Sequence, residues 1–144
     1  MVKNFYAPLS YMVLGLLAGL FFREYTKRND FPLDDFSQLN VLHTHLLTLG
    51  FIVFLIVLLL DAVFHLSGRK SFAVFFWTYN IGVLTTVTMM LIHGMVTVQG
   101  TPESDISPAI SGIAGLGHIF ITIGLMAFFV AFKPAVAEKM ASMN

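Results

Sequence analysis

Residues 39–66 read LNVLHTHLLTLGFIVFLIVLLLDAVFHL, and this stretch decides the fold class of the chain. Asp61 is the only aspartate, glutamate, lysine or arginine among its 28 residues. An α-helix needs about 20 apolar residues to cross the hydrocarbon core of a membrane. The stretch therefore predicts a membrane-spanning helix that tilts or extends beyond the bilayer.

Three other apolar segments accompany this helix, at residues 5–22, 71–98 and 111–132. The 144-residue chain is 57% hydrophobic and 11% charged, whereas soluble domains carry about 25% charged residues. So few charges cannot cover a water-soluble globule of this size. We therefore predict an all-α protein, an integral membrane four-helix bundle in which residues 1–144 form a single transmembrane domain.

The basic residues predict how this bundle is oriented. The N-terminus, the loop between the second and third segments, and the C-terminal tail would share one side of the membrane. The basic residues on that side are Lys3, Arg69, Lys70, Lys133 and Lys139. The opposite side holds Arg23, Lys27 and Arg28. The excess of lysine and arginine on the first side predicts that both termini are cytoplasmic.

Charge and cysteine counts exclude several classes of function. Eight basic residues are balanced by eight acidic ones, which leaves no basic patch for nucleic acid. The chain has no cysteine, so thiolate metal sites, iron–sulfur clusters and covalently attached c-type haem are excluded. No phosphate-binding loop or dinucleotide fingerprint is present. The chemistry must therefore come from the five histidines.

The second segment carries two histidines that point in nearly opposite directions. A histidine inside a membrane helix costs free energy unless it has a partner, so it marks a candidate site. His43 and Asp61 are five whole helical turns apart, and Gly50 and His65 lie within about 60° of their direction. We expect this polar face to point into the bundle. His45 lies about 160° from His43, so we expect it to face lipid, interfacial water or another subunit.

The third and fourth segments each carry one histidine beside small residues. His93 shares a helix face with Gly82, and His118 shares one with Gly115. His118 is nominally about 12 Å deeper in the membrane than His43, unless the fourth helix slides outward or tilts. We expect all three interior histidines to lie in the outer half of the membrane.

Two neutral imidazoles on facing helices can ligate the iron of a haem from both sides. We predict a haem b protein with His43 and His118 as axial ligands and His93 as a substitute or supporting partner. Small residues next to a histidine let a flat macrocycle lie against the helix. The candidate cofactor-binding residues are His43, His45, His93, His118, Gly50 and Gly115.

The remaining roles around such a haem stay open. The third interior histidine could bond a haem propionate, orient an axial ligand or bind an exogenous metal. The propionates need a polar or cationic exit, for which Arg23, Lys27 and Arg28 are candidates. Two histidine ligands predict electron transfer, whereas an open iron position predicts binding or sensing of a diatomic gas.

Three other functions compete with the haem hypothesis. His43, His93 and His118 could hold copper or zinc without haem. A path lined by Asp61 and His65, with Tyr79 and Asn80, would instead suit a small carrier or channel subunit; alternatively, Asp61 and His65 form a helix-end pair. A structural subunit of a larger complex would need no cofactor.

Part of the second segment resembles a helix found in known membrane proteins. Residues 42–51, LHTHLLTLGF, followed by Phe64 and His65, resemble a helix of small bacterial membrane proteins distantly similar to haem–copper oxidase subunit I. The run Leu42-His43-Thr44 followed by two leucines is also similar to a stretch of nitric-oxide reductase large subunits. The chain as a whole resembles an uncharacterised group of small four-helix bacterial membrane proteins.

This resemblance implies a set of further expectations. In nitric-oxide reductases the matching histidine is an axial ligand of a low-spin haem b, which implies that role for His43. It also implies the bacterial inner membrane and a respiratory electron donor. Nothing matches the copper-ligating histidines, so the resemblance does not extend to oxygen or nitric-oxide reduction. Those cores have threefold pseudosymmetry with four helices per unit, which implies a homo-oligomer, with a trimer as one form and His45 at the subunit interface.

Overall fold

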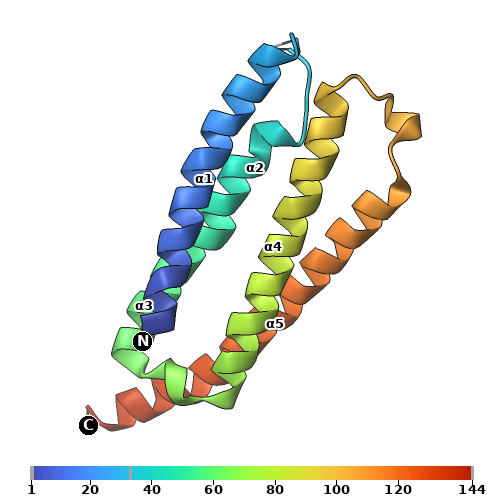
Figure 1. The fold of residues 1–144 in the computed structure, drawn as a ribbon. Coiled ribbons are helices and arrows are strands. Elements are labelled where there is room, and N and C mark those ends of the chain that lie inside the picture. The colour runs from blue at the N-terminus through green and yellow to red at the C-terminus, as the bar shows by residue number, and fades with distance from the viewer. Residues whose placement is uncertain (1, 33, 144) are drawn as a thin grey trace.

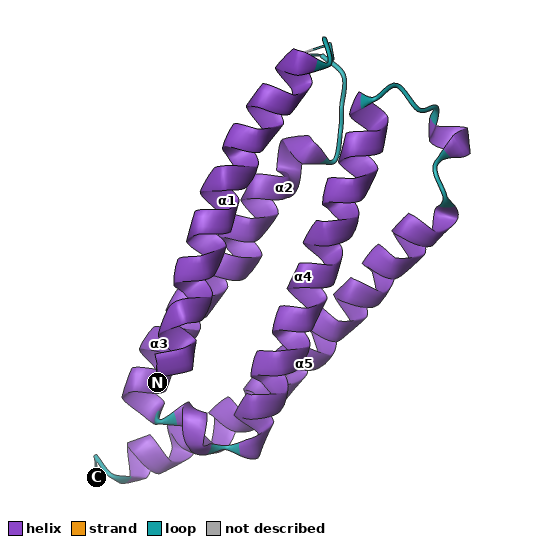
Figure 2. Cartoon of the chain, viewed as in Figure 1, coloured by secondary structure: helices purple, strands orange, loops and turns teal. Residues whose placement is uncertain are grey.

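The computed structural model describes residues 2–32 and 34–143 of the chain. The longest helices are α1 (Val2–Arg28), α4 (Lys70–Val98) and α5 (Pro108–Ala141). Between α1 and α4 the chain forms α2 (Leu39–His45), the π-helical segment η1 (Leu46–Ile52) and α3 (Val53–Phe64). Two short 3-10 turns, η2 (Leu66–Gly68) and η3 (Glu103–Asp105), lie in the connections. Figure 2 shows only helices and loops in this described part.

The predicted all-α fold is confirmed for the described residues. The segments α2, η1 and α3 run on as one helix, so these residues contain four helices long and apolar enough to cross a membrane. The first and last helices are longer than their apolar segments at 5–22 and 111–132 because polar turns extend both of them. The side chain of Lys3, which the orientation argument counted, lies outside the described part.

The helices are arranged as two neighbouring pairs. In Figure 1, α1 lies along the helix formed by α2, η1 and α3, and α4 lies beside α5. Contacts of α4 with α2 and η1, and of α3 with α5, join the two pairs. Both termini lie at one end of the bundle, here called the terminal end. Towards the opposite end α5 diverges from α4.

Glycines hold α4 and α5 together near the middle of their length. A Cβ atom on Gly82 would lie 2.6 Å from the backbone nitrogen of Ile121 and 2.7 Å from the carbonyl oxygen of Gly117. On Gly124 it would lie 2.9 Å from the backbone nitrogen of Tyr79. Small residues allow membrane helices to approach this closely. Beyond this contact, a Cβ on Gly112 or Gly115 would meet nothing within 4 Å, because α5 has left α4.

The π-helical segment is stabilised by a tyrosine from α4. The wider turn of a π-helix replaces i→i+4 hydrogen bonds by i→i+5 bonds and can leave carbonyl groups without their usual partner. The Tyr79 hydroxyl donates to the carbonyl oxygen of Leu49 at 3.1 Å. The Phe54 ring packs against Tyr79 with a centroid distance of 5.5 Å and stacks on Tyr11 at 5.7 Å. This aromatic core fixes η1 between α1 and α4.

Asp61 joins three parts of the chain at the terminal end. Its carboxylate is 1% exposed and accepts hydrogen bonds from Asn4 Nδ2 at 2.7 Å and from the Ser67 amide at 2.6 Å. His65 ends α3 in the left-handed conformation, with φ 52°, and is exposed. The Asp61 carboxylate therefore bonds α1 and the turn before α4, while His65 reaches only the Asp61 backbone carbonyl, to which its amide donates at 2.9 Å.

We expect Asp61→Ala to destabilise the bundle by about 1–3 kcal/mol, because it leaves the buried Asn4 amide and the part-buried Ser67 amide without this acceptor. The thermal unfolding midpoint in detergent should fall by about 3–10 °C. Asp61→Asn is the matched control, because its amide oxygen can still accept one of the two bonds and the loss should be smaller. An unchanged midpoint for Asp61→Ala would contradict this account.

Candidate functional site

A pocket of about 450 Å³ opens between α2, α4 and α5, on the side of the bundle away from the terminal end. It exists because α5 diverges from α4 beyond the glycine contact. We call it the histidine pocket, since three of the five histidines line it. Its lining consists of Gln38, His45, Thr86, Met89, Met90, His93, Glu103, Ile110, Ser111, Ala114, Gly115 and His118.

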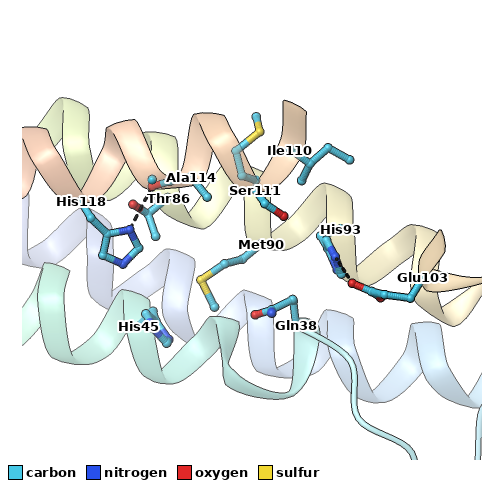
Figure 3. Close-up of a pocket in the computed structure, with 12 residues that line it drawn as sticks. Gln38, His45, Thr86, Met90, His93, Glu103, Ile110, Ser111, Ala114 and His118 are labelled. Atoms are coloured by element: carbon cyan, nitrogen blue, oxygen red, sulfur yellow. Dashed lines mark hydrogen bonds and ion pairs between the residues drawn. The ribbon is translucent and has the colours of Figure 1, made fainter. Parts of the chain in front are cut away.

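Two of these histidines share one hydrogen-bonding pattern. His45 Nδ1 lies 2.8 Å from the carbonyl oxygen of Val41, and His118 Nδ1 lies 2.9 Å from that of Ala114. A carbonyl oxygen only accepts, so each Nδ1 carries a proton, and in the neutral ring each Nε2 then keeps its lone pair. In Figure 3 the His118 ring extends from α5 towards α2, the helix that carries His45.

His93 is bonded differently from the other two. Its Nε2 lies 3.4 Å from a carboxylate oxygen of Glu103 in η3, and its Nδ1 lies 3.4 Å from the hydroxyl of Thr97. Facing a carboxylate, Nε2 carries the proton and is a donor. His93 therefore presents an N–H group where His45 and His118 present lone pairs.

The wall of α4 adds one polar atom and two soft apolar side chains. The Thr86 side chain is 1% exposed, and its Oγ1 has no hydrogen-bond partner among the described residues. Most helical threonines of this chain donate to a carbonyl one turn back, as Thr97 does to His93. Met89 and Met90 line the same wall. The Thr86 hydroxyl lies against Gly117 of α5, so it belongs to the contact between α4 and α5, and the two methionines are what this wall offers to an occupant.

The structure differs from the sequence-based expectation for His43. Its Cβ lies 3.9 Å from the position of a Cβ on Gly19 of α1, and its Nδ1 is buried without a partner among the described residues. Asp61 also faces α1, through Asn4. The predicted shared face of His43 and Asp61 is therefore real. It is covered by α1, which carries no histidine, and not by α4 and α5.

His45 takes the place expected for His43. His45 was expected to face lipid, interfacial water or another subunit, but it is half-buried and lines the histidine pocket between α2, α4 and α5. His93 and His118 lie in the pocket as expected. His118 was expected to lie deeper in the membrane than the histidines of the second helix. His45 and His118 nevertheless line the same pocket, since α5 tilts and continues to Ala141.

The two glycines of the predicted site, Gly50 and Gly115, also lie in different places. Gly115 lines the histidine pocket and leaves open space where a side chain would be. Gly50 faces α1 instead, where an added Cβ would overlap the ring of Tyr11. Gly115 therefore remains a candidate wall for a flat ligand, whereas Gly50 serves the packing of α1.

The predicted cationic exit also lies elsewhere. Arg23 and Lys27 line a separate pocket on the last turns of α1, and Arg28 ends that helix. Among the described residues, the lining of the histidine pocket contains no lysine or arginine. Its polar groups are instead Gln38, Ser111 and the pair His93–Glu103, which the sequence did not single out together.

The histidine pocket does not form a three-ligand metal site in this arrangement. Among the described residues, no three histidine, aspartate or glutamate side chains come close enough together to hold one metal ion. A haem needs only one or two protein ligands, because the porphyrin supplies the other four. The Nε2 atoms of His45 and His118 are the groups available for that role.

Comparison with known proteins adds one finding. A family model described as "Protein of unknown function (DUF2871)" matches residues 1–135. No curated protein and no solved structure matches the chain. The match supports the expectation of an uncharacterised family, while the similarity to haem–copper oxidase and nitric-oxide reductase subunits stays a prediction.

Proposed function

Because the chain belongs to the DUF2871 family, whose description assigns no activity, we propose its function from the histidine pocket: it is an integral membrane protein that binds haem b and transfers electrons. One observation carries the proposal. Two histidines on different helices, His45 and His118, line the same pocket, and each uses Nδ1 to bond a backbone carbonyl, which leaves Nε2 as the ring nitrogen available to a ligand.

The surroundings of both histidines fit axial ligands. Histidines that bind metals usually donate their other ring N–H to a carbonyl or carboxylate, which fixes the tautomer and the ring orientation. Val41 and Ala114 provide those carbonyl groups from one turn earlier in each helix. Met89, Met90 and Ile110 offer apolar surface to a macrocycle, and Gly115 offers a flat one. A bound haem would supply reversible one-electron chemistry at its iron.

The competing functions have less support. A copper or zinc site needs three close ligands, and His93 already faces Glu103. For a carrier path, Tyr79 donates to the Leu49 carbonyl and Asn80 accepts from the Tyr11 hydroxyl. Asp61 is likewise engaged by Asn4, so these groups serve the packing of the bundle. Gas binding is favoured over electron transfer only if one axial position stays open.

The setting of the protein is part of the proposal. We place it in the bacterial inner membrane with both termini cytoplasmic, which puts the histidine pocket in the outer half of the bilayer. A respiratory donor would then supply electrons from the outer side. We also propose a homo-oligomer, with a trimer as one form. His45 does not support a subunit interface, since it lines the pocket.

The decisive experiment is a reduced-minus-oxidised absorption spectrum of the full-length protein, expressed with ample haem and purified in detergent. We expect a Soret band with sharp α and β bands, because two histidine ligands give a low-spin haem b. In His118→Ala the sharp bands should be lost, while His65→Ala, at an exposed histidine, should match the wild type. A colourless wild-type protein would reject the proposed function.

A further inference from the structure

The mouth of the histidine pocket already holds a carboxylate. Glu103 lies in η3, on the connection between α4 and α5, and one of its carboxylate oxygens lies 3.4 Å from His93 Nε2. Figure 3 shows Glu103 reaching towards His93 at the end of the pocket away from His118. The geometry at His93 is thus that of an imidazole N–H recognising a carboxylate.

The contact between Glu103 and His93 is easily exchanged. The Glu103 side chain is 78% exposed, whereas that of His93 is 14% exposed. Exposed ion pairs contribute little to stability because water and salt screen them. Glu103 also sits on a three-residue turn rather than on a long helix. The largely buried His93 is held on the long helix α4, whereas the exposed Glu103 can leave.

Neighbouring groups favour a carboxylate at this point. Gln38 and Ser111 line the same pocket and can donate hydrogen bonds from an amide and a hydroxyl. Among the described residues, the pocket lining has no lysine or arginine, so a ligand carboxylate here would depend on these N–H and O–H donors. A ligand carboxylate placed here would meet His93 as its main donor, with Glu103 as the only nearby charge of its own sign in that lining.

We propose that His93 binds a carboxylate group of the pocket's ligand, and that Glu103 is an exchangeable stand-in that leaves His93 when this ligand binds. This inference rests on the proposed function, in which the ligand is haem b and the carboxylates are its two propionates. It assigns His93 to the porphyrin edge and not to the iron. Glu103 then opposes binding, because its charge repels the incoming propionate.

The test compares iron protoporphyrin IX with its dimethyl ester, which keeps the iron and ring but has no free carboxylate. Both are titrated into the full-length apoprotein in detergent, and the dissociation constants are measured. We expect Glu103→Gln to bind iron protoporphyrin IX about three- to tenfold more tightly and His93→Ala about tenfold more weakly. The ester should bind all variants alike.

Asp105→Asn is the matched control, since Asp105 lies in the same turn and bonds Ser104 instead of facing the pocket. It should leave both constants unchanged. Unchanged or weaker binding by Glu103→Gln, or equal effects on the ester, would overturn the inference. If one of these results is found and haem still binds through His45 and His118, the proposed function is kept and only the inference about His93 and Glu103 is rejected. A wild type that binds neither porphyrin rejects both.

Discussion

Replacing His45 by alanine is expected to abolish the low-spin haem spectrum, whereas replacing His43 by alanine leaves it intact. The two histidines are two residues apart on the same helix, so they share depth, helix and local composition. His45 lines the histidine pocket with its Nε2 free, while His43 lies against Gly19 of α1. Loss of an iron ligand should lower haem affinity at least about 100-fold, since even supporting partners account for 10–100-fold.

The measurement is the reduced-minus-oxidised spectrum of each variant, together with the haem content per chain. Circular dichroism of the same samples separates loss of cofactor from loss of fold. His43→Ala should stay within error of the wild type in haem content, because its Nδ1 has no partner to lose among the described residues. The reverse pattern, with haem lost only in His43→Ala, would assign the ligand to the face that meets α1 and refute our choice.

The four long helices could be predicted from hydropathy because each must satisfy its own backbone within a membrane. This physical requirement is local, and it needs no knowledge of neighbouring helices. The ends of the helices were less predictable. The last helix continues past Lys133 and Pro134 to Ala141, because polar residues extend a helix beyond the apolar segment that hydropathy detects.

The histidine site could be predicted only in part. Helical phase correctly grouped His43 with Asp61 on one face and set His45 on another. It could not say which face meets α4 and α5, because that depends on helix–helix packing and not on the helix itself. The role of Glu103 could not be predicted for a similar reason. The path of the connection between α4 and α5 brings Glu103 back to His93, and that path is not visible in the sequence.

Gly82→Ala is expected to destabilise the bundle strongly. The new Cβ would lie 2.6 Å from Ile121 N and 2.7 Å from Gly117 O, and both atoms belong to the backbone of α5. A flexible side chain could rotate away, but a backbone cannot, so α5 must shift as a whole. Overpacking of this kind costs about 3 kcal/mol and should lower the unfolding midpoint by about 6–12 °C.

Two other glycines turn this prediction into a graded series. In Gly124→Ala the added Cβ would lie 2.9 Å from Tyr79 N, so the loss should be smaller than in Gly82→Ala. In Gly112→Ala the Cβ would meet nothing within 4 Å, so stability should stay level or rise slightly with the better helix former. Thermal unfolding of the three variants in one detergent measures the order.

The order of these three variants also bears on the histidine pocket. The pocket exists because α4 and α5 are held together at Gly82 and separate beyond it, which places His118 opposite His45. If Gly82→Ala unfolded at the same temperature as Gly112→Ala, the two helices could move apart freely at their contact. The position of His118 would then not be set by the packing of the bundle, and a haem held between α2 and α5 would lose its structural basis. A graded loss instead means that the contact at Gly82 fixes the separation that the pocket requires.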